Sequence, residues 1–298
     1  MFWKLKAGIR RPRKLVENIF GTLRMWVEWQ RLYDKLPEPK CEAQVPVGDR
    51  TLHRQLKNEL EIAGLIVKEI SIDLNEFLLY LKDANYERFD YYFNGGKHPS
   101  FYEKALEHYI SAKLLNLNKN DVYIDIANGD SPSAQIYSEI FGCQSFAQDM
   151  YFRKTERNKI AGNSRSIPVK DGFASKMALH NAFEHFEGDD DTAFIAEADR
   201  VLCHGGKLCI VPLFMFNKLA NQTDPAVLFN YNIFDEAATI FAAKGWLNRF
   251  GRHYDVTNLV SRLVNHMGDM TLTIYFLTNE KIIDNGCYAK FVALFEKP

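Results

Sequence analysis

The sequence predicts an α/β fold with a mostly parallel sheet that ends in an antiparallel hairpin and is preceded by an N-terminal helical region. Two observations carry this prediction. From residue 121 onward, short β-rich runs alternate with helical runs, which is typical of crossover units on a parallel sheet. Near the C-terminus, two β-rich segments are joined by the short stretch KIIDNG, which favours an antiparallel hairpin. The chain therefore divides into three predicted regions, residues 1–36, 37–118 and 119–298.

Residues 1–36 are predicted to form a basic amphipathic helix. Nine of them are Lys or Arg, against three acidic residues. Leu15, Ile19, Leu23 and Trp26 recur at spacings of three and four, which places them on one helix face. This helix either packs against the sheet domain or a second copy in a homo-oligomer, or makes peripheral contact with the inner face of an anionic membrane.

Residues 37–118 are predicted to hold a linker followed by helices. Residues 37–48 contain three prolines and one glycine without periodicity, which is typical of a linker. Helical periodicity follows in residues 51–70, 74–89 and 100–117. Ser100 is expected to cap the last of these helices, with Glu103 as its capping-box partner.

Residues 119–298 are predicted to form the sheet and its crossover helices. The β-rich runs before the hairpin are residues 121–127, 143–150, 176–182 and 207–214. Helical runs lie between them, at residues 133–141 and 192–202. The hairpin is expected at residues 270–280 and 287–297, which finish the sheet.

The composition excludes several classes of protein. A chain of 298 residues with 47% hydrophobic and 25% charged residues can bury a sizeable core. Its formal net charge of −1 argues against a nucleic-acid partner. The sequence shows no run of 18 apolar residues and no secretory signal pattern. Its five cysteines are scattered without a C-x-x-C pair, so we expect a cytoplasmic protein without disulfides.

The turn after the first strand, residues 125–133, stands where α/β sheets bind ligands, beyond the carboxyl end of a strand. Ser131 and Pro132 then suit the start of a helix, because Ser caps free amides and Pro fits the first helical position. The turn holds only one glycine. On its residues alone it is either a binding loop or a plain strand-to-helix corner.

The run from Asp121 to Phe214 resembles class I S-adenosylmethionine-dependent methyltransferases, whose sheet is Rossmann-like. YIDIANGDS stands where this family has a strand, an acidic residue and a Gly-rich loop, and AQDM stands at the end of the second strand. The resemblance covers about residues 100–298 and lies in the order and spacing of these segments. It implies S-adenosyl-L-methionine as cofactor. The cofactor-binding residues that it implies are Asp125, Ala127, Asn128, Gly129, Asp149, Asn163, Ser164 and His180.

The resemblance also implies a role for each part of this set. Asp149 would accept hydrogen bonds from both ribose hydroxyls, for which a carboxylate is well suited. Asn163 and Ser164 would lie at the adenine edge. Asp125 would orient the loop or the methionine ammonium group.

Two residues depart from the family's loop. Ala127 and Ser131 stand where glycines are usual. A non-glycine residue in the left-handed region costs about 1–2 kcal/mol. Either the loop avoids that conformation or cofactor binding is weakened, and the second outcome would leave a catalytically inactive methyltransferase-like scaffold.

His180 is the predicted catalytic residue. The resemblance places it after the fourth strand, on the side of the sheet where the methyl group should lie, and a His there could remove a proton from a hydroxyl acceptor. Glu184 and His185 are expected at a helix start and in the cofactor pocket. HNAFEH does not match the spacing of zinc motifs, so no metal site is predicted.

Two polar segments allow further predictions. The acidic run EGDDDT, residues 187–192, is expected to cap the next helix, because carboxylates suit a helix N-terminus. Arg252, His253 and Tyr254 either contact the substrate or cap the helix that follows them.

Taken as a whole, the sequence predicts a cytoplasmic methyltransferase that transfers a methyl group from S-adenosylmethionine to a hydroxyl of a glycan or small molecule. Its segments IDIANGDSP, GDDDT and RHYD are similar to bacterial proteins associated with polysaccharide biosynthesis, which favours a sugar acceptor. The alternative is an inactive methyltransferase-like protein that serves in binding or as a scaffold.

Overall fold

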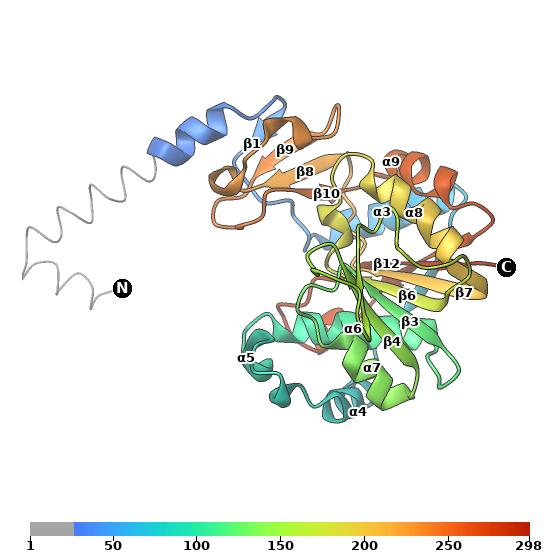
Figure 1. Ribbon diagram of the computed structural model, residues 1–298. Coiled ribbons are helices and arrows are strands. Elements are labelled where there is room, and N and C mark those ends of the chain that lie inside the picture. The colour runs from blue at the N-terminus through green and yellow to red at the C-terminus, as the bar shows by residue number, and fades with distance from the viewer. Residues whose placement is uncertain (1–26) are drawn as a thin grey trace, which may run out of the picture. The chain divides into compact units, whose positions relative to one another are not determined.

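A computed structural model describes residues 27–298, and within it the chain forms two units (Figure 1). The larger unit comprises residues 46–220 and 252–298. The smaller unit comprises the described residues up to Val45 together with residues 221–251. The sequence places residues 221–251 inside the sheet domain, whereas the structure groups them with the N-terminal residues.

The larger unit is built on a sheet of eight strands in the order β2-β11-β12-β7-β6-β3-β4-β5. Strand β12 is antiparallel to both of its neighbours, β11 and β7, and the other neighbouring pairs are parallel. The predicted α/β fold, a mostly parallel sheet with an antiparallel C-terminal hairpin, is therefore confirmed. The strands are β2 (Ile66–Ile70), β3 (Val122–Ile126), β4 (Gln144–Asp149), β5 (Lys159–Ala161), β6 (Ala174–His180), β7 (Leu202–Val211), β11 (Thr271–Leu277) and β12 (Phe291–Glu296).

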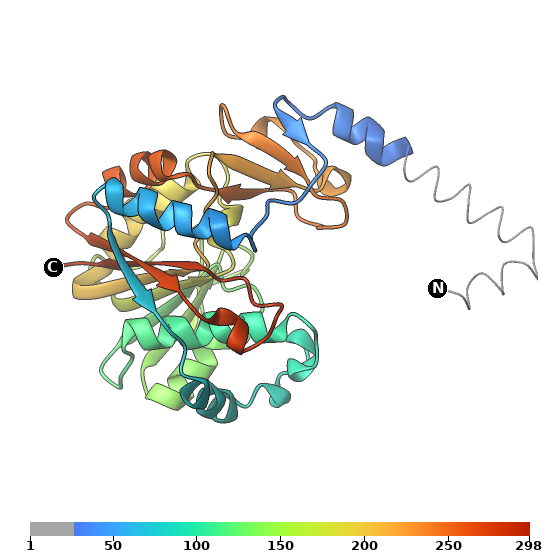
Figure 2. The same ribbon diagram turned by 180° about the vertical axis from the view of Figure 1, so that it is seen from behind.

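Helices cover both faces of this sheet. Figures 1 and 2 show α4, α6 and α7 on one face and α3, α8 and α9 on the other. None of the helices described within residues 27–298 is long and apolar enough to cross a membrane. The helices are α3 (Arg50–Ile62), α4 (Leu74–Ala84), α5 (Phe93–Gly96), α6 (Phe101–Leu115), α7 (Ser133–Phe141), α8 (Asp190–Val201) and α9 (Val256–Arg262), with short 3-10 turns η1 (Tyr86–Arg88), η2 (Phe183–His185), η5 (Val264–His266) and η6 (Glu280–Ile282).

Helix α6 is the most deeply buried element before the first predicted strand. Leu106 and Ile110 are fully buried and belong to the same apolar core as Tyr123 of β3 and Ile136 of α7. Each such side chain contributes about 1.5–3 kcal/mol through the water-accessible surface that it loses. This packing fixes α6 against the strands that carry the candidate site.

The helix predicted over residues 51–70 is only partly correct. Helix α3 ends at Ile62, Gly64 takes a left-handed φ of 81°, and residues 66–70 form β2 beside β11. Glycine at this position ends a helix at low cost. The β-branched residues Ile66 and Val67 then favour a strand. The change from helix to strand is not visible in the apolar spacing of residues 51–70, because the spacing near residue 70 fits a helix as well as a strand.

The predicted capping box at the start of α6 does not form. Ser100 makes no side-chain hydrogen bond to the helix amides. The Glu103 carboxylate instead accepts hydrogen bonds from the amides of Tyr288 and Ala289, at 2.8 and 2.9 Å. Tertiary structure therefore supplies Glu103 with better-placed donors than its own helix.

The smaller unit contains most of a second sheet, in the order β1-β9-β8-β10. Its strands are β1 (Lys40–Cys41), β8 (Ala220–Thr223), β9 (Thr239–Ala242) and β10 (Gly251–His253), with the 3-10 turns η3 (Pro225–Val227) and η4 (Tyr231–Ile233). Strand β1 lies in the predicted linker, residues 37–48, and pairs with β9 in parallel. Two residues are too few to show a periodicity, so the sequence gives no sign of β1. Residues 27–34 are helical, as predicted, and the rest of the predicted basic helix lies outside the described residues.

Candidate functional site

The loop between β3 and α7 enters the left-handed region twice, at Ala127 with φ 51° and at Gly129 with φ 56°. Two hydrogen bonds to Gln148 hold the loop in place. The Ala127 amide donates to Gln148 Oε1 at 3.2 Å, and the Asn128 amide donates to the Gln148 carbonyl at 2.9 Å. The loop therefore adopts a left-handed conformation at Ala127, although this costs about 1–2 kcal/mol for a residue with a Cβ.

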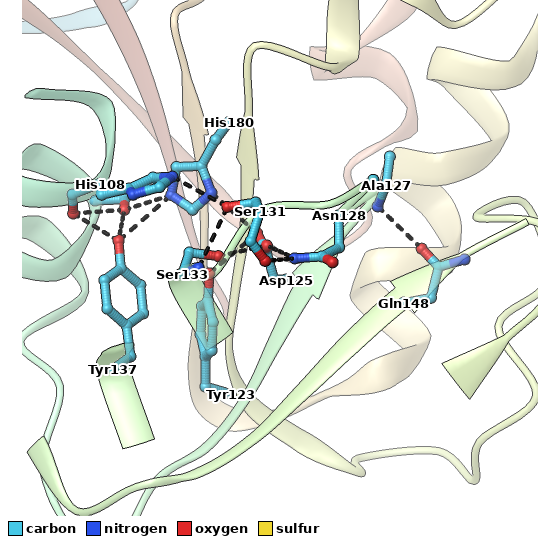
Figure 3. A network of polar contacts seen from close by, with 12 residues as sticks. His108, Tyr123, Asp125, Ala127, Asn128, Ser131, Ser133, Tyr137, Gln148 and His180 are labelled. Atoms are coloured by element: carbon cyan, nitrogen blue, oxygen red, sulfur yellow. Dashed lines mark hydrogen bonds and ion pairs between the residues drawn. The ribbon is translucent and has the colours of Figure 1, made fainter. Parts of the chain in front are cut away.

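Asp125 lies at the end of β3, is 1% exposed, and ties the loop to its surroundings (Figure 3). Its Oδ2 accepts hydrogen bonds from Asn128 Nδ2 and Ser133 Oγ, both at 2.5 Å. Its Oδ1 lies 2.9 Å from His180 Nδ1 and accepts a bond from Tyr123 OH at 3.3 Å. These contacts favour the predicted loop-orienting role, because both oxygens already serve the protein's own groups.

Asp149 ends β4, the strand beside β3, and is 5% exposed. Its Oδ2 accepts a hydrogen bond from the Gly129 amide at 2.8 Å, and its Oδ1 accepts one from the Tyr151 amide at 2.8 Å. A carboxylate oxygen has more than one lone pair, so each can accept a further bond from a ligand. Asp149 thus links the loop of β3 to the turn after β4.

His180 ends β6, and its side chain is 4% exposed. Nδ1 faces Asp125, while Nε2 lies 2.7 Å from Ser111 Oγ and 3.4 Å from Tyr137 OH. The ring also meets that of His108 at a centroid distance of 4.7 Å. Both ring nitrogens thus have partners inside the protein, which favours a role for His180 in positioning Asp125. The predicted proton transfer stays a prediction.

A pocket of about 510 Å³ opens beside these residues, and we call it the loop pocket. Its walls come from the loop at residues 127–131, from residues 180–182 after β6, and from residues 91–93 with His98 and Lys104. Loop residues Ala127, Asn128 and Gly129 are thus brought together with His180, as predicted from the sequence. Such a volume is typical of a small-molecule site.

Asn163 and Ser164 do not line the loop pocket. They follow β5, whose residue Ala161 pairs with Asp149, so they lie just beyond the Asp149 end of the sheet. Asn163 is exposed, and its Oδ1 accepts a hydrogen bond from the Arg165 amide at 2.9 Å. Before this turn, a Cβ on Gly162 would come within 2.9 Å of Pro168, so the chain needs glycine there.

A buried pair of Lys104 and Glu107 that the sequence analysis missed lies behind the loop pocket. Lys104 lines the pocket and donates to Glu107 Oε1 at 2.7 Å. Glu107 is fully buried, and its Oε2 has no hydrogen-bond partner among residues 27–298. Burial, with the nearby charge of Glu103, raises the pKa of Glu107 to about 8 against the opposing effect of Lys104. The sequence does contain a signal for this pair, because Glu103 and Glu107 stand one turn apart in a largely apolar helix.

The wall next to Lys104 is polar as well. Tyr288 OH donates to Asn181 Oδ1 at 3.0 Å and lies 3.5 Å from Lys104 Nζ. Asn181 has a left-handed φ of 49° and lines the loop pocket beside His180. Three side chains from α6, from the segment after β6 and from the segment before β12 therefore meet at one side of this pocket.

Arg252, His253 and Tyr254 are not surface contacts for a substrate. All three are buried, and Arg252 forms a fully buried ion pair with Asp191 at 2.9 Å. Tyr254 OH donates to the same carboxylate at 2.6 Å. Burial acts to raise the pKa of Asp191, but bonds from Arg262 and Tyr254 and the charge of Arg252 outweigh it and lower the pKa.

The acidic run serves the start of α8 only in part, since Asp190 and Asp191 lie in its first turn and Asp191 Oδ1 accepts a hydrogen bond from the Thr192 amide at 2.8 Å. Asp189, at the N-terminal end of α8, makes no side-chain capping bond, and Asp191 faces the core. Among residues 27–298, no group of three or more His, Cys, Asp or Glu side chains could hold a metal ion.

Comparison with known proteins identifies one family. Residues 124–210 match the family described as a methyltransferase domain. No curated protein matches the chain. Among solved structures, the YcgJ protein from Bacillus subtilis is 18% identical with a TM-score of 0.33, over 41% of this chain and 53% of its own length. The chain thus spans about half the length of that protein.

A second solved structure covers more of the chain. It is the Burkholderia thailandensis 1,6-didemethyltoxoflavin-N1-methyltransferase with bound 1,6-didemethyltoxoflavin and S-adenosylhomocysteine, which is 13% identical with a TM-score of 0.44. The match covers 76% of this chain and 91% of the Burkholderia protein. The family match therefore places a methyltransferase domain at residues 124–210, the part of the sheet that runs from β3 to β7.

Proposed function

We propose that this protein transfers a methyl group from S-adenosylmethionine to a hydroxyl of a small molecule or glycan. One observation carries the proposal. The loop at residues 127–131 and the buried carboxylate of Asp149 meet at the carboxyl ends of β3 and β4, beside the loop pocket. This is the edge at which open α/β sheets bind their ligands.

The residues at this edge fit the cofactor. A Cβ added to Gly129 would meet nothing within 4 Å, so the loop leaves open space on that side. Asp149 keeps lone pairs for the two ribose hydroxyls. Asn163 and Ser164 follow the strand that pairs with β4, which supports their assignment to the adenine edge. Asp125, held by His180, would keep the loop in the required conformation.

The bound cofactor supplies the methyl group on a sulfonium centre. The protein's own contribution to an in-line displacement is to hold the acceptor close to that centre and aligned with it. Lys104 and Asn181 offer polar contacts for a hydroxyl-bearing acceptor, and the aromatic residues at 91–93 offer ring faces. A pocket with an aromatic wall and a few polar groups suits a small organic acceptor or one sugar unit of a glycan.

Calorimetry with S-adenosylhomocysteine tests the cofactor site. We expect the wild-type protein to bind and Asp149→Ala to lose about 1.5–3 kcal/mol of binding free energy, typical of hydrogen bonds to a charged group. Asp149→Asn separates charge from loop support, because its amide oxygen can still accept one of the two backbone bonds. Asp171→Ala, which removes a carboxylate that is 83% exposed, serves as the control.

Two outcomes would contradict the proposal in different ways. If wild-type protein gives no heat with either the methyl donor or its demethylated product, the methyltransferase function is wrong. If Asp149→Ala binds like the wild type, Asp149 is not in the cofactor site.

A panel of monosaccharides and oligosaccharides, assayed with methyl-labelled S-adenosylmethionine, would identify the acceptor. Transfer only to non-sugar hydroxyls would remove the glycan and polysaccharide assignment.

The proposed roles of the N-terminal segment concern residues 1–36, of which residues 1–26 lie outside those described. Peripheral membrane contact predicts that full-length protein floats with anionic vesicles and that a variant starting near residue 45 does not. Packing against a second copy predicts a smaller assembly for the shortened variant in light scattering. A cytoplasmic location stays a prediction from the cysteine pattern.

A further inference from the structure

A second pocket, of about 630 Å³, lies between α3 and the carboxyl ends of β2 and β11, and we call it the basic pocket. Figure 2 shows α3 in front of the sheet on this side, with β11 and the turn η6 nearby. The basic pocket shares no lining residue with the loop pocket. It therefore needs an explanation of its own.

The basic pocket carries a strong positive charge. Its lining contains five basic and two acidic side chains, which leaves a formal charge of +3 in a chain whose net charge is −1. The basic side chains are Arg50, Arg54, Lys57, Lys281 and Lys290, and the acidic ones are Glu69 and Glu280. Such an accumulation is local and does not follow from the overall composition.

The lysines of the basic pocket are already engaged. Lys57 pairs with Glu69 at 3.3 Å, and Lys290 pairs with Glu280 at 2.8 Å. Lys281 donates to the carbonyls of Asn285 and Cys287. Each of the two acidic side chains in the basic pocket is thus paired with a lysine.

Arg50 and Arg54 are different. Both are exposed, and within residues 27–298 neither guanidinium has a hydrogen bond or an ion pair. The two residues are one helical turn apart on α3, so they lie on the same face of that helix. In the part of the chain that the structure describes, they are the charges of the basic pocket that no ion pair compensates.

The placement of these two arginines destabilises α3 when no anion is bound. Arg50 is the first residue of α3, where the helix dipole is positive and disfavours a cation. Like charges at this spacing also repel each other. The N-cap carboxylate of Asp49 is engaged by the amides of Thr51 and Leu52, at 2.8 and 3.1 Å. A bound anion between the two guanidinium groups would offset both costs.

We propose that the basic pocket binds a small molecule that carries a diphosphate group. A guanidinium group binds a phosphate through two parallel hydrogen bonds, and side chains at this spacing start about 5–6 Å apart, which suits two neighbouring phosphates. Phe276 and Ile282 add apolar surface to the same pocket for an organic part. The volume lies in the usual range for a small-molecule site. This site is independent of the methyl-transfer chemistry.

Titration calorimetry on the full chain tests the site with two probes, inorganic pyrophosphate and uridine diphosphate. We expect both to bind, and the double variant Arg50→Gln, Arg54→Gln to weaken each by at least about tenfold, because charge-assisted bidentate bonds are lost. Tighter binding of uridine diphosphate would show that the organic part also lies in the pocket. Equal affinities would show recognition of the diphosphate alone.

The control is the double variant Arg31→Gln, Lys119→Gln, which removes the same charge from exposed positions outside the pocket. Thermal unfolding checks that all three proteins are folded. If the wild type binds neither probe, the site is wrong. If both double variants weaken binding equally, only general charge attraction is present and the site is wrong as well. Neither result depends on whether the protein binds S-adenosylhomocysteine.

Discussion

Replacing Glu107 by Gln should change how the stability of this protein depends on pH. Glu107 is fully buried with one oxygen unpartnered among residues 27–298, and burial raises its pKa from an ordinary value of 4.5 to about 8. Between these two values the folded protein keeps the proton, whereas the unfolded chain has released it. The free energy of unfolding therefore falls as the pH rises through this window and is level on either side of it.

The size of the effect follows from the same shift. One pKa unit corresponds to about 1.4 kcal/mol, so the wild-type protein should lose on the order of 3–5 kcal/mol between about pH 5 and about pH 9 from Glu107 alone. Glutamine has nearly the same shape and cannot ionise, so Glu107→Gln lacks this loss. At low pH the glutamine takes the place of a neutral carboxylic acid, and at high pH it takes the place of a buried, charged carboxylate.

Urea unfolding of both proteins across this pH range measures the difference. We expect Glu107→Gln to gain stability relative to the wild type steadily as the pH rises, by about the amount given above. Glu87→Gln, at an exposed position, is the matched control. If the difference between Glu107→Gln and the wild type is the same at every pH, the raised pKa of Glu107 is wrong, and so is the picture of a poorly solvated pair with Lys104.

Three other substitutions probe separate parts of the fold. Ala127→Gly should raise the free energy of unfolding by about 1 kcal/mol, because it relieves a left-handed residue, and a loss measured by denaturant titration would contradict the loop conformation. Asp191→Asn should cost about 3–5 kcal/mol, since it leaves Arg252 charged and buried, and a cost equal to that of Asp190→Asn in the same titration would refute the buried pair. Burial, aided by the charge of His185, lowers the pKa of His253 to about 3, so stability should fall as the pH drops below about 6.5. On acidification, the melting temperature of His253→Phe should fall less than that of the wild type. An equal decrease in both proteins would show that His253 is not the group responsible.

Much of the candidate site could be predicted from local sequence. The turn after β3 shows a strand, an acidic residue and a helix start within a few residues, and these are short-range patterns. The position of Asp149 follows in the same way from the end of the next strand. His180 was placed correctly at the end of β6, but its predicted use depended on where its ring nitrogens point. That depends on Ser111 and Asp125, which come from other elements.

The residues that sequence reasoning missed have partners far along the chain. Glu103 bonds to the amides of Tyr288 and Ala289, and Arg252 pairs with Asp191. Local sequence patterns predict that such side chains cap a helix or contact a ligand at the surface, because nothing near them in sequence shows that they are buried. Arg50 and Arg54 likewise look like an ordinary solvated helix face until β11 and the segment before β12 bring further lysines to the same pocket.

The sequence by itself determined the alternation of strands and helices over residues 121–214, the antiparallel last hairpin and the strand-to-helix corner at residues 125–133. Hydrophobic periodicity and turn residues specify these features, and both act over a few residues. Only the tertiary structure decided which polar side chains are buried, which of them are paired, and that residues 221–251 group with the described residues up to Val45. Those outcomes depend on contacts between distant segments, where desolvation and charge pairing set the energy, and no local pattern records them.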